Sequence, residues 1–136
     1  MKTILVCYED RPLASRVLER AAELAKLSGA KVVVTSVAHV VHGKGLGPLD
    51  PTDPPARHEE ELKEAAAQLA TLGVAGAETV VAVGDPAHAI LTVAAEHAVD
   101  LIVLGAHDGG AISRVLSGSV GDAVAHKAHA DVLIVH

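Results

Sequence analysis

Residues 101–110 read Leu-Ile-Val-Leu-Gly-Ala-His-Asp-Gly-Gly, and this stretch decides the fold more than any other part of the chain. The apolar run Leu101–Leu104 is typical of a buried strand, and a glycine-rich loop follows it directly. Further on, Gly118-Ser119-Val120 predicts the start of a helix, because serine is favoured at helix N-termini. A strand, a loop of small residues and a helix N-terminus together form a cradle for an anion such as phosphate.

The same alternation of strand and helix extends from this stretch to both ends of the chain. The predicted strands are residues 2–8, 31–37, 78–83, 100–105 and 132–135. The predicted helices, with apolar residues at helical spacing, are 12–27, 56–72, 86–98 and 119–128. This alternation predicts one α/β domain over residues 1–136, a Rossmann-like five-stranded parallel sheet with helices on both faces.

Three local signals support the helix boundaries. Ser28-Gly29 is typical of a helix C-terminus, and Asp85-Pro86 is typical of an N-cap followed by proline at the first helical position. The acidic run Glu59–Glu61 near the start of the second helix is interpreted as a solvated face that the helix dipole favours. Residues 40–55, rich in glycine and proline, are predicted as a loop.

The predicted strand order is 3-2-1-4-5, and it locates the candidate ligand site. In a doubly wound sheet, ligands bind at the carboxyl ends of the strands where the winding direction reverses. That point lies between the first and fourth strands. The loops that follow Tyr8 and Gly105 are therefore expected to face each other across a crevice.

Composition excludes several classes of function. The 136 residues carry a net charge of −6 and contain one tyrosine, no phenylalanine and no tryptophan. This argues against binding to nucleic acid, which needs a basic surface and, for single strands, stacking aromatic side chains. The lone cysteine, Cys7, forms no intrachain disulfide and is interpreted as an inert core thiol. With no signal peptide and no apolar run long enough for a bilayer, we expect a cytoplasmic protein without a membrane partner.

An ordered set of motifs across the chain resembles the universal stress protein family. These motifs are Ile4–Glu9, Gly84-Asp85-Pro86, Asp100–Gly105, Gly118-Ser119-Val120 and Asp131–Val135. In the nucleotide-binding branch of that family, the loop reads Gly, two residues, Gly, nine residues, Gly, then Ser or Thr. Gly105, Gly118 and Ser119 match this spacing, while Asp108 replaces the second glycine.

The resemblance implies that ATP binds with its phosphates over this loop and its adenine against the second strand. Val37 matches the position whose backbone contacts adenine, and Glu9 stands where the family has aspartate. The candidate binding residues are Glu9, Val37, Gly105, Asp108, Gly109, Gly110, Gly118, Ser119 and Val120. No catalytic residue is predicted, and slow ATP hydrolysis is the most that we expect of the site, because no positioned general base is visible.

Asp108 decides between two hypotheses. A carboxylate about 5 Å from a phosphate charge, at an effective dielectric constant of about 20, repels it by roughly 3 kcal/mol. Binding survives if Mg²⁺ or Mn²⁺ bridges Asp108, Glu9 and Asp10 to the phosphates, or if Gly109 and Gly110 form the cradle instead. Otherwise the phosphate loop has decayed, and the chain is an interaction or signalling dimer that binds no nucleotide.

Two further hypotheses concern histidines and the last strand. His39, His42 and His107 offer a loose metal site at the crevice, although solvated loop histidines are the favoured interpretation. Residues 131–136 form an apolar edge strand without proline, which favours pairing with a second copy. The resemblance likewise implies a homodimer through this strand, and charged substitutions at Leu133 and Val135 are expected to give monomer.

Overall fold

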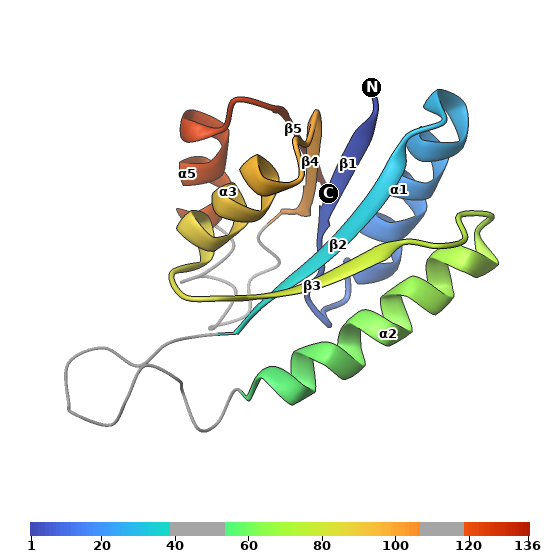
Figure 1. Cartoon of the computed structure of the whole chain (residues 1–136), viewed down its shortest axis with the longest axis horizontal. Helices are drawn as coiled ribbons and strands as arrows, with labels where there is room; N and C mark the ends of the chain where they lie inside the picture. The colour runs from blue at the N-terminus through green and yellow to red at the C-terminus, as the bar shows by residue number, and fades with distance from the viewer. Residues whose placement is uncertain (39–53, 107–118) are drawn as a thin grey trace.

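The computed structural model describes residues 1–38, 54–106 and 119–136, and Figure 1 shows how these parts are arranged. The strands are β1 (Thr3–Cys7), β2 (Lys31–Ala38), β3 (Glu78–Val83), β4 (Leu101–Gly105) and β5 (Asp131–Val135). The helices of the described parts are α1 (Ala14–Ser28), α2 (Pro55–Thr71), α3 (Pro86–Glu96) and α5 (Ser119–Lys127). All nine predicted elements are therefore confirmed, with ends that differ by at most two residues.

The five strands form one parallel sheet in the order β3-β2-β1-β4-β5, which confirms the predicted topology. β1 lies at the centre, where Leu5 is paired with Val33 of β2 on one side and with Ile102 of β4 on the other. The chain winds from β1 out to β3 and then returns to β4 on the other side of β1. The winding direction therefore reverses between β1 and β4, as the sequence predicts.

Helices cover both faces of the sheet (Figure 1). Successive side chains of a strand point to opposite faces, so each strand contributes to two cores. Ile4 and Val6 of β1 point toward α1 and α2, in a core that includes Leu18 and Leu62. Leu5 belongs to the second core, which α3 and α5 cover. Both cores are built from valine, leucine, isoleucine and alanine, with Tyr8 as the single aromatic side chain.

The predicted helix caps are also confirmed. Gly29 ends α1 in the left-handed conformation, with φ of 74°, and its N–H donates to the carbonyl of Ala25 at 2.8 Å. The Asp85 carboxylate accepts the N–H of His88 at 3.1 Å, and Pro86 occupies the first position of α3. None of the helices in the described parts is both long enough and apolar enough to span a bilayer.

Candidate functional site

A cleft opens at the carboxyl ends of β1 and β4, where the winding direction reverses. Its walls come from the end of β1 and the turn after it, the first turns of α1, α3, the end of β4, and the start of α5. The lining residues are Cys7, Tyr8, Glu9, Arg11, Leu13, Ala14, Val17, Ile90, Leu104, Gly105, Ala106 and Val120. The segments that follow Tyr8 and Gly105 therefore share one cleft, as expected.

A tight turn carries the chain from β1 into α1 and places two opposite charges at the cleft. The carbonyl of Glu9 accepts the N–H of Arg11 at 2.8 Å, and the carbonyl of Arg11 accepts the N–H of Ala14 at 2.9 Å. Glu9 is exposed, whereas Arg11 is half-buried. The cleft thus offers a carboxylate that accepts hydrogen bonds and a guanidinium that binds anions.

Gly105 ends β4 directly beneath the N-terminal part of α1. A Cβ added to Gly105 would lie 3.3 Å from Cγ2 of Val17, closer than side chains ordinarily pack, and 3.6 Å from Cβ of Leu13, an ordinary van der Waals contact. The glycine therefore lets α1 approach the end of β4 and narrow this side of the cleft.

Cys7 lies on the cleft wall, and its environment suppresses thiol chemistry. Burial, followed by the negative charge of Glu9, raises the pKa of Cys7 to about 12. The thiol is therefore protonated at neutral pH and is a poor nucleophile. This agrees with the interpretation of Cys7 as an inert core thiol.

β2 extends past the end of β1, and its last residues border the cleft side of the sheet. β1 is paired with β2 only as far as Cys7 opposite Thr35, whereas β2 remains paired with β3 up to Ala38 opposite Val83. We call the three residues Ser36–Ala38 the β2 overhang. In a parallel sheet the peptide groups of alternate residues point to alternate neighbours.

This alternation sets the direction of the Val37 peptide groups. The carbonyl of Thr35 accepts the N–H of Tyr8, at 2.8 Å, on the β1 side of β2. The carbonyl of Ala38 accepts the N–H of Gly84, at 3.1 Å, on the β3 side. The N–H and C=O of Val37 follow the direction of Thr35 and point to the side where β1 has ended, while its side chain packs in the core beneath α3.

The structure brings together some of the predicted site residues. Glu9, Gly105 and Val120 line the cleft. Val37 lies in the β2 overhang and Ser119 is the first residue of α5, and neither is among the residues that line the cleft. Asp108, Gly109, Gly110 and Gly118 lie outside the described residues, as do His39, His42 and His107. Within residues 1–38, 54–106 and 119–136, no group of three or more histidine, cysteine, aspartate or glutamate side chains is arranged to hold a metal ion.

A buried polar pair next to the site has no counterpart in the sequence predictions. The Ser36 hydroxyl lies 2.5 Å from Nδ1 of His58, and both residues are buried. Ser36 is a polar residue in an apolar strand, but no sequence spacing connects it to His58, 22 positions further on. The interpretation of Glu59–Glu61 as a solvated face is wrong for Glu61, whose side chain is only 14% exposed and lies 3.7 Å from His58 Nδ1.

The last strand requires a second correction. Val135 is buried, and Leu133 packs against the core beneath α1, so charged substitutions at either position would disrupt the fold. The exposed apolar side chain of β5 is Ile134, which is 37% exposed. The prediction that Leu133 and Val135 report on self-association is therefore wrong, because the alternation of the strand turns both inward.

The fold and the cleft define a class: a doubly wound α/β domain with a cleft at the carboxyl ends of β1 and β4, where ligands bind in such folds. The model of the universal stress protein family matches residues 1–136, and the chain belongs to that family. A universal stress protein of Thermus aquaticus is 31% identical over 134 residues, which cover 98% of each chain.

Solved structures of the family are similar over the whole chain. The crystal structure of a universal stress protein in complex with cAMP is 29% identical, with a TM-score of 0.76 over 99% of this chain and 96% of the other. The universal stress protein of Archaeoglobus fulgidus in complex with dAMP is 27% identical, with a TM-score of 0.71 over 100% of this chain and 98% of the other.

Proposed function

We propose that this universal stress protein binds an adenine nucleotide, ATP above all, in the cleft between β1 and β4, and that it acts as a dimer in the cytoplasm. The observation that carries the proposal is the β2 overhang, which directs the peptide groups of Val37 toward the side where β1 has ended. Relatives of similar fold form complexes with cAMP and dAMP, so an adenine nucleotide suits this family.

The chemistry of adenine suits the Val37 peptide. The base carries a hydrogen-bond donor at its amino group and an acceptor at the neighbouring ring nitrogen, and a peptide carries one acceptor and one donor. Because both peptide groups of a strand residue point the same way, Val37 presents the complementary pair without any side-chain contribution. The proposal assigns the ribose hydroxyls to the Glu9 carboxylate on the cleft wall.

The phosphates require a positive or dipolar environment. The start of α5 supplies helix N–H groups at Ser119 and Val120, and the proposal adds the glycines at 105, 109, 110 and 118 as backbone donors. The Arg11 guanidinium on the cleft wall opposes the charge of Asp108. If Mg²⁺ or Mn²⁺ lies between Asp108 and the phosphates, both bind the metal ion and the repulsion between their negative charges is removed. ATP binding is therefore expected to depend on the metal.

A second function is kept because of the Asp108 carboxylate in the loop sequence. If that charge has abolished the phosphate site, the chain is an interaction dimer of the same family that uses no nucleotide. In both proposals the dimer forms through residues 131–136, because β5 is an edge of the sheet with an exposed apolar side chain at Ile134.

The deciding experiment is a calorimetric titration of ATP, cAMP and dAMP with and without Mg²⁺. It compares wild type with Asp108→Gly and with Asp108→Asn, which removes the charge but keeps a side chain. We expect wild type to bind ATP more tightly with Mg²⁺, and both variants to bind metal-free ATP about tenfold more tightly than wild type, since about 1.4 kcal/mol of repulsion is tenfold in affinity.

Two other results have clear meanings. Binding by Asp108→Gly but not by wild type would favour the interaction dimer with a decayed site. If none of the three proteins binds any of the nucleotides at millimolar concentration, the proposed function is wrong.

A further inference from the structure

The Ser36–His58 pair joins the β2 overhang to the first turns of α2. The Ser36 hydroxyl lies 2.5 Å from Nδ1 of His58, with 3% of Ser36 and 8% of His58 exposed. Ser36 stands two residues before the end of β2, and His58 stands three residues after the start of α2. The hydrogen bond therefore links the two described ends of the chain that flank residues 39–53.

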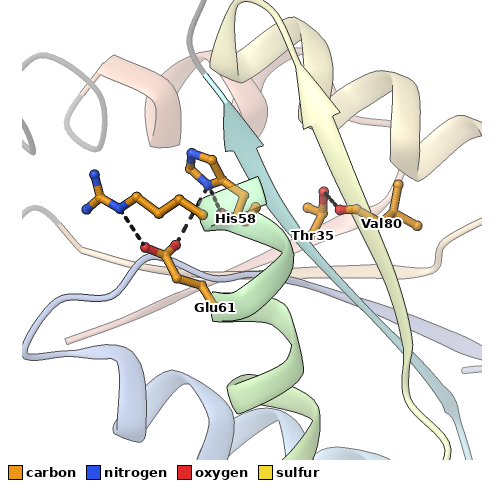
Figure 2. Close-up of polar contacts among 6 residues, drawn as sticks. Thr35, His58, Glu61 and Val80 are labelled. Atoms are coloured by element: carbon orange, nitrogen blue, oxygen red, sulfur yellow. Dashed lines mark hydrogen bonds and ion pairs between the residues drawn. The ribbon is translucent and has the colours of Figure 1, made fainter. Parts of the chain in front are cut away.

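The His58 ring is oriented by its own helix. Oε2 of Glu61 lies 3.7 Å from Nδ1 of His58, and Oε1 of Glu61 lies 3.3 Å from Nε of Arg57. Figure 2 shows His58 and Glu61 close together at the start of α2, beside the end of β2. The Arg57–Glu61 ion pair holds Glu61 next to Nδ1, the same ring nitrogen that contacts Ser36, and so restricts the ring.

The cleft wall lies next to this group. Tyr8 is buried, and burial together with the negative charges of Asp10, Glu64 and Glu61 raises the pKa of its hydroxyl. Tyr8 thus experiences the field of α2 carboxylates while it lines the cleft. The polar group at the start of α2 is therefore close to the edge of the sheet that carries the proposed site.

The β2 overhang needs support that β1 does not give. Along its length it is paired with β3. Just before it, the Thr35 hydroxyl donates to the carbonyl of Val80 (Figure 2), at a distance of 2.8 Å. On the face toward α3, the Val37 side chain packs in the core. On the face toward α2, the Ser36–His58 hydrogen bond holds the overhang.

A buried hydroxyl–imidazole pair is a costly way to fill a core. Apolar side chains at both positions 36 and 58 would pack there without polar groups to desolvate, so the pair contributes little net stability. Its directional geometry instead fixes one position of the strand relative to the helix.

We propose that His58 is a positioning residue for nucleotide binding: through Ser36 it fixes the β2 overhang, and thereby holds the peptide groups of Val37 in the orientation that adenine needs. This inference rests on the proposed function, because it assigns Val37 the contact with the base. His58 itself touches no nucleotide.

The test compares three variants of the pair. Ser36→Ala and His58→Leu remove the hydrogen bond, whereas His58→Asn keeps a polar atom near the place of Nδ1. Asp100→Ala serves as the stability control, because it removes hydrogen bonds to the N–H groups of Lys2 and Thr3 at the opposite edge of the sheet. The readouts are the dissociation constant for Mg-ATP and the hydrogen exchange of amides 36–38 without nucleotide.

We expect Ser36→Ala and His58→Leu to raise the dissociation constant about three- to tenfold and to speed exchange in the overhang by a similar factor. His58→Asn should restore most of both, and Asp100→Ala should change neither, even if its unfolding temperature falls. Wild-type binding with an unchanged dissociation constant in His58→Leu would overturn this inference alone. If Asp100→Ala weakens Mg-ATP binding as much as His58→Leu does, this inference is also overturned. Failure of wild type to bind would overturn the proposed function as well.

Discussion

The N–H of Tyr8 donates a hydrogen bond of 2.8 Å to the carbonyl of Thr35, and beyond this bond β2 continues without β1 beside it. The offset between the two strands has two consequences. After β1 the chain turns away, and Glu9 and Arg11 in this turn line the cleft. β2 continues, and it directs the peptide groups of Val37 toward the side where β1 has ended. The proposed site therefore depends on the offset between the ends of β1 and β2.

Substitution of Val37 by proline tests the role of its peptide. Proline lacks an N–H, and this N–H points away from β3, so the β2–β3 ladder loses no hydrogen bond. We expect Val37→Pro to stay folded by circular dichroism and to bind ATP at least about tenfold more weakly. Val37→Ala, which keeps the N–H, is the control. Equal affinity of the two variants would exclude the backbone contact with adenine.

Arg11 gives a prediction that depends on the charge of the ligand. Arg11 lines the cleft, so Arg11→Gln should weaken ATP binding about three- to tenfold and cAMP binding less, because a triphosphate carries more charge. Arg16→Gln, on an exposed position of α1, is the matched control. Calorimetry at low and high salt measures both effects. An equal loss for ATP and cAMP would show that Arg11 does not face the phosphates.

The framework of the fold could be predicted from the sequence because each boundary carries a local signal. Asp85 and Pro86 start α3 with a side-chain cap and a preset φ, and Gly29 ends α1 where only a left-handed residue fits. The helix predicted to reach residue 98 ends instead at Glu96, because Ala98 takes a φ of 50° in the turn to β4. The residue type at position 98 does not predict this positive φ.

The site was predictable only in part, because it depends on contacts between distant segments. Glu9 and Gly105 follow from strand ends and winding direction, which a sequence reveals. The Ser36–His58 pair and the low exposure of Glu61 arise when α2 packs on β2, at separations that no motif encodes. The roles of Leu133 and Val135 were misjudged because an edge strand still has one face turned to the core.

Self-association through β5 is tested at Ile134. Ile134→Glu places a charge at an exposed apolar position of the edge strand, so it should convert dimer to monomer with a smaller loss of stability than a charge at the buried Val135. Light scattering with size-exclusion chromatography measures the mass. The control is Leu27→Glu, at an 82% exposed position near the end of α1. A dimer that persists in Ile134→Glu, or a wild type that is monomeric, would contradict pairing through β5.

Asp100 lies at the amino ends of the strands, opposite the cleft, and it makes the stability of the fold depend on pH. Its carboxylate accepts the N–H groups of Lys2 at 2.7 Å and Thr3 at 2.9 Å, and these hydrogen bonds hold the pKa of Asp100 below its ordinary value of 3.8. A lowered pKa in the folded state means that the stabilisation is complete above the unfolded pKa and is lost as the pH falls through the folded one.

Urea unfolding of wild type and Asp100→Asn between pH 2 and 7 checks this. Wild type should be the more stable protein at neutral pH, and the difference should shrink below about pH 4 as Asp100 takes up its proton. A difference that stays constant across this range would show that the charge of Asp100 contributes nothing.

Binding of an adenine nucleotide at the carboxyl edge of the sheet is tested most directly by following the backbone amide signals of wild type by NMR during titration with Mg-ATP. We expect saturable shifts at Glu9–Arg11, Val37, Gly105 and Val120, with little change at Lys2, Asp100 and Asp131 on the other edge. Absence of shifts at millimolar Mg-ATP, or shifts confined to the opposite edge, would contradict the proposed site.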